Sequence, residues 1–181
     1  MKCLALLVLF AFVAFGCGKK PGQEPQATAS TPYGSPQELA GYLQQIDPLV
    51  MQLNTAHQDL YKRVGTSGKA TGANLAQAMA QGLPQLQQAL KDVEQISPPA
   101  LMAPFHDKLK KLVQLRVEAY SQTIEGRQLE EAKDPQFESH YTQSEQKLAE
   151  AQSLGSQLGQ ERQQIQQALL KALPQDQAAS R

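Results

Sequence analysis

The spacing of apolar residues is the feature that most constrains the fold of this chain. Between Leu39 and Val64 the seam residues are alternately four and three positions apart, and His57 takes the one seam position that is not apolar. This spacing aligns side chains along one side of an α-helix, as in a coiled-coil seam. Three later segments carry similar apolar faces, and no segment has the strict alternation of a strand. The sequence therefore predicts an all-α domain.

Capping residues and prolines set the expected ends of four helices. Ser35-Pro36-Gln37-Glu38 forms a capping box with proline at the first helical position. The first helix is expected to run from there to Gly65, the second over residues 73–96, and the third from between Pro99 and Pro104 to Glu131. The fourth is expected to have Asp134 as its cap and Pro135 as its first helical residue, and to run to Leu173. The interior prolines Pro48 and Pro84 predict a kink in each of the first two helices.

Short loops between long amphipathic helices favour an antiparallel up-down four-helix bundle with coiled-coil-like seams, built from residues 35–173. Small residues at Ser144, Ala151 and Gly155 would let a neighbouring helix approach the fourth helix closely. Because the fourth helix is the longest, an alternative is that its part from Gln160 onward projects past the bundle and pairs with a partner. Residues 174–181 are expected to fray.

The N-terminus has the layout of a signal peptide. Lys2 supplies a positive charge, and the twelve residues from Leu4 to Phe15 form an unbroken apolar run. Twelve helical residues reach only about 18 Å, whereas a hydrocarbon core is about 30 Å thick. The run is therefore interpreted as the apolar region of a signal peptide and not as a transmembrane helix.

The apolar run ends at Ala14-Phe15-Gly16-Cys17, which resembles the lipobox of bacterial lipoproteins. The resemblance implies that residues 1–16 are removed and that Cys17 carries an S-diacylglycerol and an N-acyl group. Lipoproteins retained in the inner membrane tend to have Asp after this cysteine. Gly18 and Lys19 follow here, so the resemblance points to the outer membrane, facing the periplasm. Cys3 leaves with the signal peptide, so no thiol is then left for a disulfide, a metal site or a nucleophile.

Residues 17–34 connect this cysteine to the first helix. Pro, Gly, Ser and Thr dominate the segment and no apolar period is present, so it is predicted to be a disordered tether. The whole chain has 17 basic and 17 acidic residues. No net charge therefore draws it toward nucleic acid, and we expect no nucleic-acid partner.

The three histidines are the candidates for proton transfer or metal binding. His57 is interpreted as a core or partly exposed histidine on the seam, His106 follows a proline-rich turn, and His140 is placed at the edge of the bundle. None of them has Glu three residues before it, so the Glu-x-x-His pattern of di-iron bundles is absent. Motifs for zinc, covalent haem attachment and phosphate binding are absent as well. We predict no catalytic residue, no metal site and no cofactor.

Arg116 falls beside the apolar seam of the third helix. If it is buried it needs a carboxylate partner, for which Glu118, Glu138 and Glu145 are the candidates. The alternative, which we favour, is that its aliphatic stem lies on apolar surface while the guanidinium stays in water. Together with the three lysines at positions 108, 110 and 111, it is expected to form a solvated basic face.

The sequence thus predicts a membrane-tethered periplasmic lipoprotein that is not an enzyme. This prediction rests on the anchor, on the helical seams and on the absence of a group of catalytic residues. The first hypothesis is a protein-binding or scaffolding module of the cell envelope, with homo-oligomerisation left open. The second is a binding module for a lipid or small apolar ligand between the helices, which requires an apolar cavity. An enzyme or metal carrier that uses His57 or His106 is the third and last.

Overall fold

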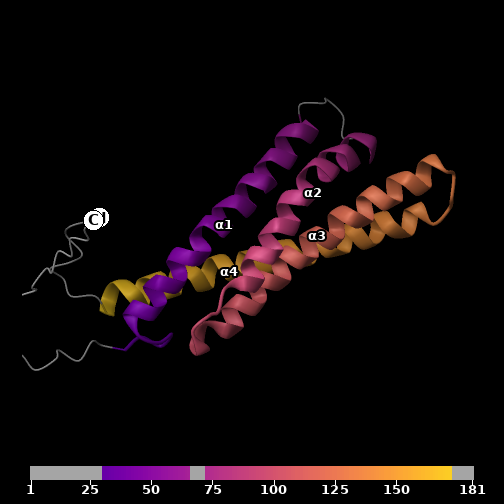
Figure 1. Cartoon of the computed structure of the whole chain (residues 1–181). Coiled ribbons are helices and arrows are strands. Elements are labelled where there is room, and N and C mark those ends of the chain that lie inside the picture. Colours follow the sequence, from indigo (N-terminus) through magenta and orange to yellow (C-terminus); the bar gives the residue numbers. More distant parts are fainter. Residues whose placement is uncertain (1–29, 66–71, 173–181) are drawn as a thin grey trace, which may run out of the picture.

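A computed structural model describes residues 30–65 and 72–172, which fold almost entirely into helix (Figure 1). The four α-helices are α1 (Pro36–Gly65), α2 (Gly72–Gln95), α3 (Ala103–Glu131) and α4 (Phe137–Ala172), and a short 3-10 helix, η1 (Ala100–Met102), leads into α3. No β-strand is present in these two ranges. The prediction of an all-α fold is thus confirmed for them.

The start of α1 follows the predicted capping box. The backbone N–H of Glu38 donates to Ser35 Oγ at 3.3 Å, and Ser35 Oγ donates to the Glu38 carboxylate at 2.8 Å. Pro36 opens the helix, where its missing N–H costs nothing. The Ser35 hydroxyl therefore bonds both to the backbone of the first turn and to the Glu38 side chain.

A left-handed residue ends α3 and delays the start of α4. Lys133 has φ 59°, and its N–H donates to the carbonyl of Glu130, while the N–H of Asp134 donates to the carbonyl of Leu129 at 2.9 Å. This pair of bonds is a Schellman motif. The carboxylate of Asp134 then accepts from the N–H of Gln136 at 2.9 Å. Because residues 134–136 form this turn, α4 begins at Phe137 and not at Pro135 as predicted.

The helices form two hairpins that pack against each other. Figure 1 shows α1 beside α2 and α3 beside α4, and the second hairpin extends past the first at the end where α3 leads into α4. The hairpins meet mainly through α2 and α3, whereas α1 and α4 touch only sparsely. The side of the molecule between α1 and α4 is therefore its most open side.

The core lies where the four helices meet. The largest side chains with less than 2% exposure come from every helix: Leu39, Tyr42 and Ile46, then Met79, Leu86 and Val93, then Met102 and Val113, and finally Ile165. On α1, Leu53 is buried but Val50 and Leu60 are only partly buried, and His57 is exposed. The α1 seam therefore passes from the core to the surface along the second half of the helix.

Both prolines lie within continuous helices. α1 continues through Pro48 and α2 through Pro84. The kink expected at each of them stays a prediction, and so does the regular up-down arrangement of the four helices.

The last residues of the predicted tether belong to the folded body. Thr31 Oγ1 donates to the carbonyl of Gly34 at 2.9 Å and accepts from the N–H of Tyr33 at 3.1 Å, and Thr31 is only 8% exposed. Ser30 to Tyr33 and the last turns of α4 border a common hollow. The hydroxyl of Thr31 thus ties residues 31–34, which the sequence assigns to the tether, into a turn.

The C-terminal part of α4 packs on the body and does not project from it. Ile165 is 1% exposed and belongs to the core, and Arg162 forms an ion pair with Asp47 of α1 at 2.8 Å. The alternative that α4 extends freely beyond Gln160 is therefore wrong over the described residues.

The predicted signal peptide, Cys17, tether residues up to 29, the loop at 66–71 and the tail at 174–181 lie outside the described residues. Their assignments stay predictions. None of the helices in the described part of the chain combines the length and the apolarity that crossing a membrane requires.

Candidate functional site

A cleft of about 510 Å³ lies between α1, α3 and α4, within the range of about 300–1,000 Å³ typical of small-ligand sites. Its apolar lining comes from all three helices: Val50, Leu53 and Leu60, then Phe105, Leu109 and Leu112, and then Leu148, Ala151 and Leu158. No acidic residue is found among the described residues that line it. This space, named here the α1–α4 cleft, is the candidate functional site.

Small residues on α4 keep the cleft open. A Cβ atom added at Gly159 would meet no heavy atom within 4 Å, and one added at Gly155 would meet only Leu112 Cδ1, at 3.9 Å. Ser144, nearer the start of the helix, behaves differently, since its Oγ donates to the carbonyl of Ala119 at 2.8 Å. The predicted close approach of a neighbouring helix is thus confirmed at Ser144, whereas Gly155 lines the cleft with Leu112 of α3 as its neighbour.

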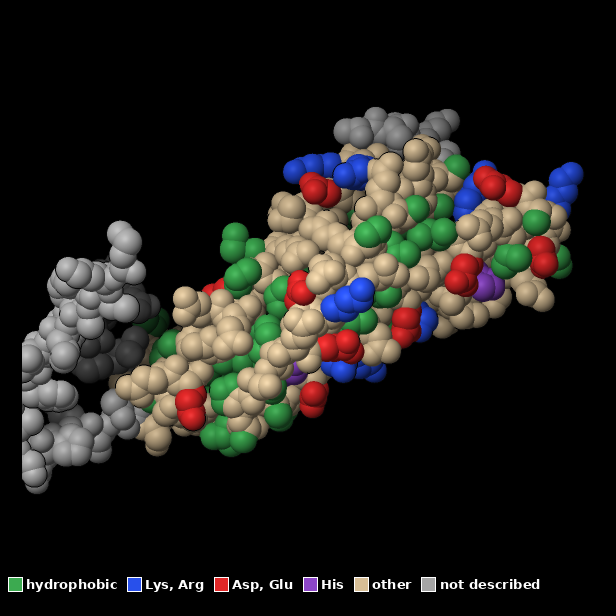
Figure 2. All heavy atoms as spheres, viewed as in Figure 1, with side chains coloured by type: hydrophobic (Ala, Val, Ile, Leu, Met, Phe, Trp, Pro, Cys, Tyr) green, Lys and Arg blue, Asp and Glu red, His purple; other side chains and the backbone are tan. Residues whose placement is uncertain are grey.

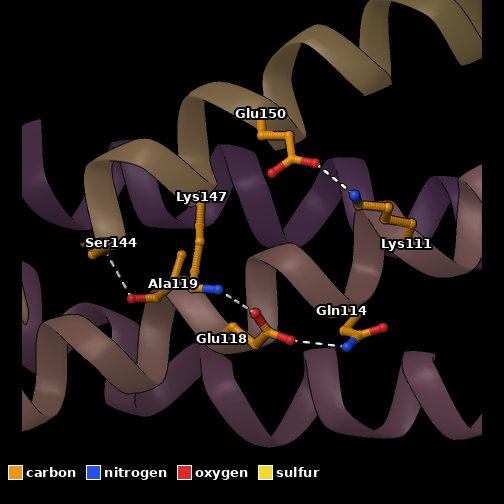
Figure 3. A network of polar contacts seen from close by, with 7 residues as sticks. All are labelled: Lys111, Gln114, Glu118, Ala119, Ser144, Lys147 and Glu150. Atoms are coloured by element: carbon orange, nitrogen blue, oxygen red, sulfur yellow. Dashed lines mark hydrogen bonds and ion pairs between the residues drawn. The ribbon is translucent and has the colours of Figure 1, made fainter. Parts of the chain in front are cut away.

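The α3–α4 side of the cleft is held together by polar contacts (Figure 3). Figure 3 shows Lys147 of α4 reaching Glu118 of α3, and Lys111 of α3 reaching Glu150 of α4 at 2.7 Å. In the same interface the buried hydroxyls of Thr123 and Ser144 lie 2.7 Å apart. These bonds join α3 and α4 into one wall, against which α1 forms the opposite side.

Arg116 of α3 lines the cleft without a carboxylate partner among the described residues. Its Nη1 donates to the backbone carbonyl of Leu53 at 3.3 Å. Burial lowers the pKa of Arg116, and Tyr120 offsets this only in part. A cationic side chain therefore faces an apolar cleft with its charge uncompensated.

The carboxylates expected to pair with Arg116 do not. Glu118 pairs with Lys147 and accepts from Gln114 at 2.9 Å, which lowers the pKa of Glu118. Glu138 and Glu145 are exposed on α4. Arg116 is partly buried, so the favoured alternative, a guanidinium that stays in water, is also only partly correct.

A second arginine of the cleft is already paired. Arg162 of α4 donates through Nη2 to Asp47 of α1 at 2.8 Å, and this ion pair is one of the few links between the two helices. Its Nε is buried without a hydrogen-bond partner in the described part of the chain. Asp47 thus neutralises Arg162 and leaves Arg116 as the cation of the cleft that lacks a counter-charge.

His57 lies at the edge of the cleft. It is exposed and stacks edge-on against Tyr61, with 4.7 Å between ring centroids. Partial burial lowers the pKa of His57, and the nearby Arg116 lowers it further. The ring is therefore uncharged near pH 7 and borders the cleft as a neutral polar group.

His106 has a structural position outside the cleft. It is 6% exposed, and its Nδ1 lies 3.2 Å from the hydroxyl of Tyr42 on α1. Burial lowers its pKa and outweighs the opposing effect of Asp107. Burial likewise raises the pKa of Tyr42 well above its ordinary value. The pair joins α1 to α3 as two neutral groups.

The lysines of the predicted basic face on α3 are paired with carboxylates. The lysines 108, 110 and 111 pair with Glu161, Glu94 and Glu150 respectively, so the predicted solvated basic face is neutralised. His140 Nδ1 lies 3.4 Å from Glu125. On the face shown in Figure 2, acidic and basic side chains are interspersed. Among the described residues, no cluster of three or more His, Cys, Asp or Glu side chains could hold a metal ion.

Two elements of the cleft have only a weak signature in the sequence. Gly155 and Gly159 are four residues apart on one helix face, a spacing that also fits close helix packing. Arg116 is visible as a cation beside the seam, but the pairing of Glu118 with Lys147 is not.

Comparisons with protein-family models, curated proteins and solved structures found no match for this chain.

Proposed function

We propose that this chain is a lipid-anchored, non-enzymatic binding module of the bacterial cell envelope that holds an apolar ligand in the α1–α4 cleft. The observation that carries the proposal is the cleft itself, about 510 Å³ and lined mainly by leucines and other apolar side chains. It is the cavity that the second sequence hypothesis requires, and for that reason we prefer that hypothesis to the first.

The energetic argument is that water covers apolar surface in the empty cleft. Each Å² of apolar area removed from water contributes about 25 cal/mol, so a ligand that covers the leucines of the three helices gains affinity from burial alone. The α3–α4 wall supports this role because its ionic and hydroxyl bonds hold one side of the cleft in place before a ligand binds. A preformed site loses less free energy to ordering on binding.

The anchor and the location belong to the same proposal and rest on the sequence. Ala14-Phe15-Gly16-Cys17 supports lipidation of Cys17, and Gly18 and Lys19 support the outer membrane, facing the periplasm. For the fold, we propose one antiparallel up-down bundle that is left open along α1 and α4. Labelling with palmitate tests the anchor, because Cys17→Ala should abolish incorporation. Labelling of that variant would contradict it.

Ligand binding is tested by filling the cleft. Gly159→Leu adds a side chain whose Cβ meets no heavy atom within 4 Å, and leucine also favours the helix. The probe is the neutral dye Nile red, followed by fluorescence and displaced by 1-decanol. We expect Gly159→Leu to weaken dye binding at least tenfold, or about 1.4 kcal/mol.

Gly41→Leu is the matched control. Gly41 is also a helical glycine with no atom within 4 Å of an added Cβ, but it does not line the cleft. This variant should bind the dye as the wild type does. Equal binding by all three proteins, or no binding by the wild type, would contradict the proposal.

The protein-binding or scaffolding hypothesis is a second candidate. It is favoured by large apolar side chains that stay exposed on the body: Met51, Tyr61, Leu101 and Leu170, each at least 60% exposed. Crosslinking in intact cells tests it, and a partner, or a second copy of the chain, should be captured by wild type and lost on exchange of these residues for Gln. Capture that is unchanged in the exchanged variant would contradict it.

A further inference from the structure

We propose that the ligand of the α1–α4 cleft is a single-chain fatty acid whose carboxylate binds Arg116. This inference rests on the proposed function and deepens it, since it assigns the charge and the shape of the ligand.

The first argument is charge. Arg116 lines an apolar cleft, and its one hydrogen bond within the described part of the chain goes to the carbonyl of Leu53 at 3.3 Å. A guanidinium carries five N–H donors, so donors are left for a ligand. No described acidic residue lines the cleft. An anionic group placed there would supply the missing counter-charge, and hydrogen bonds to charged groups are among the stronger ones.

The second argument is the number of charges. Arg162, the other arginine of the cleft, is compensated by Asp47 at 2.8 Å, and partial burial holds His57 neutral by lowering its pKa. One uncompensated positive charge matches one negative charge. A carboxylate carries one charge, whereas a phosphate monoester carries about 1.5 to 2, part of which would be left unmatched. The planar guanidinium also fits a carboxylate through two parallel bonds.

The third argument is the shape and lining of the rest of the site. Leucines of all three helices line the rest of the cleft, among them Leu53 and Leu60 of α1 and Leu148 and Leu158 of α4. Gly155 and Gly159 leave room along α4. The volume of about 510 Å³ lies in the lower half of the usual range, which favours one alkyl chain over the two chains of a phospholipid.

The experiment compares ligands that share one ten-carbon chain and differ in charge. Binding of decanoate, 1-decanol, decyl phosphate and decyltrimethylammonium to the full chain is measured by calorimetry at pH 8, where a carboxyl group is ionised. We expect decanoate to bind most tightly. Arg116→Met should weaken decanoate binding about 10- to 100-fold and change 1-decanol binding by less than about threefold, since methionine keeps the apolar stem.

Two further variants keep the result interpretable. Arg162→Met removes a cation from the same cleft that is already paired, so we expect it to change decanoate binding by less than about threefold. Arg116→Lys keeps the charge but not the planar fork, so its affinity should fall between those of the wild type and Arg116→Met. It decides the question if Arg116→Met does not fold.

The outcomes separate this inference from the proposed function. Equal binding of decanoate and 1-decanol, unchanged by Arg116→Met, would overturn the inference and leave an apolar binding module. Tighter binding of decyl phosphate or of the cation would overturn the carboxylate assignment. If neither decanoate nor 1-decanol binds the wild type, both proposals are wrong.

Discussion

Arg116 should lower the stability of the fold that carries it, and Arg116→Met should therefore unfold less easily than the wild type. A buried ion without a partner costs several kcal/mol in free energy of unfolding. Because Arg116 is only partly buried, we expect about 2 kcal/mol for the relief of this cost. A residue kept for binding at the expense of stability is a common feature of functional sites.

The opposing contribution is small. Arg116→Met loses one hydrogen bond to the carbonyl of Leu53, which at 3.3 Å is long and contributes about 0.5–1 kcal/mol. That carbonyl belongs to the interior of α1, where it also accepts from the helix backbone. Methionine keeps the apolar stem on the wall of the cleft. The expected net result is an increase of about 1 kcal/mol in the free energy of unfolding.

Arg162→Met is the control for the same exchange at a paired arginine. It breaks the ion pair with Asp47 at 2.8 Å, whose side chains are 30% and 41% exposed, and should lower the free energy of unfolding by about 0.5 kcal/mol. Urea titrations followed by circular dichroism measure both variants at low salt. A loss of stability in Arg116→Met as large as that in Arg162→Met would refute the view that Arg116 is uncompensated.

Three other regions give predictions of their own. Ser144→Ala should cost about 2–3 kcal/mol, because it leaves the buried hydroxyl of Thr123 without its bond at 2.7 Å. Adding Thr123→Val to Ser144→Ala should recover about 1 kcal/mol of the free energy of unfolding. In a double-mutant cycle followed by urea denaturation, a double variant whose loss equals the sum of the two single losses would contradict this. Lys133→Gly should raise the free energy of unfolding by about 1 kcal/mol, because φ at this position is 59° and glycine adopts it without strain. Thermal melting should show this increase for Lys133→Gly and not for the control Lys133→Ala. Burial lowers the pKa of His106, so its contribution to stability is fully present above about pH 6.5 and is lost as the pH falls below that value. In urea titrations, the free energy of unfolding should fall less between pH 7 and pH 5.5 in His106→Gln than in the wild type. An equal fall in both proteins would count against a lowered pKa of His106.

The helices were predictable because their determinants are local. The Ser35 capping box, Pro36 at the first helical position and the proline-rich turn before α3 all act within a few residues, and each gives an observed helix end. The start of α4 was missed by two residues, Pro135 against Phe137, because Asp134 accepts from the N–H of Gln136 and forms a turn before the helix begins. Helix propensity does not reveal whether an Asp-Pro pair begins a helix or forms a turn before it.

The cleft was not predictable in the same way, because it depends on contacts between distant segments. Arg162 and Asp47 meet across 115 positions of the sequence, and nothing local encodes that pairing. Glu118 is two positions from Arg116 on α3, so the two side chains do not face each other, and the pairing of Glu118 with Lys147 depends on the register of α3 against α4. His57 fits the seam by spacing, yet it is exposed at the cleft because α1 leaves the core before the seam ends.

The position of the turn at Thr31–Gly34 bears on how a bound ligand would exchange with the membrane. It sets the point at which the chain enters the body beside the last turns of α4. On α4 the cleft reaches Arg162, two residues before Gln164, which borders the hollow beside Thr31. The end of the cleft at Arg162 therefore lies near the point where the chain enters the body. In the proposed lipid-anchored form, a bound molecule would exchange with the lipid surface through that end.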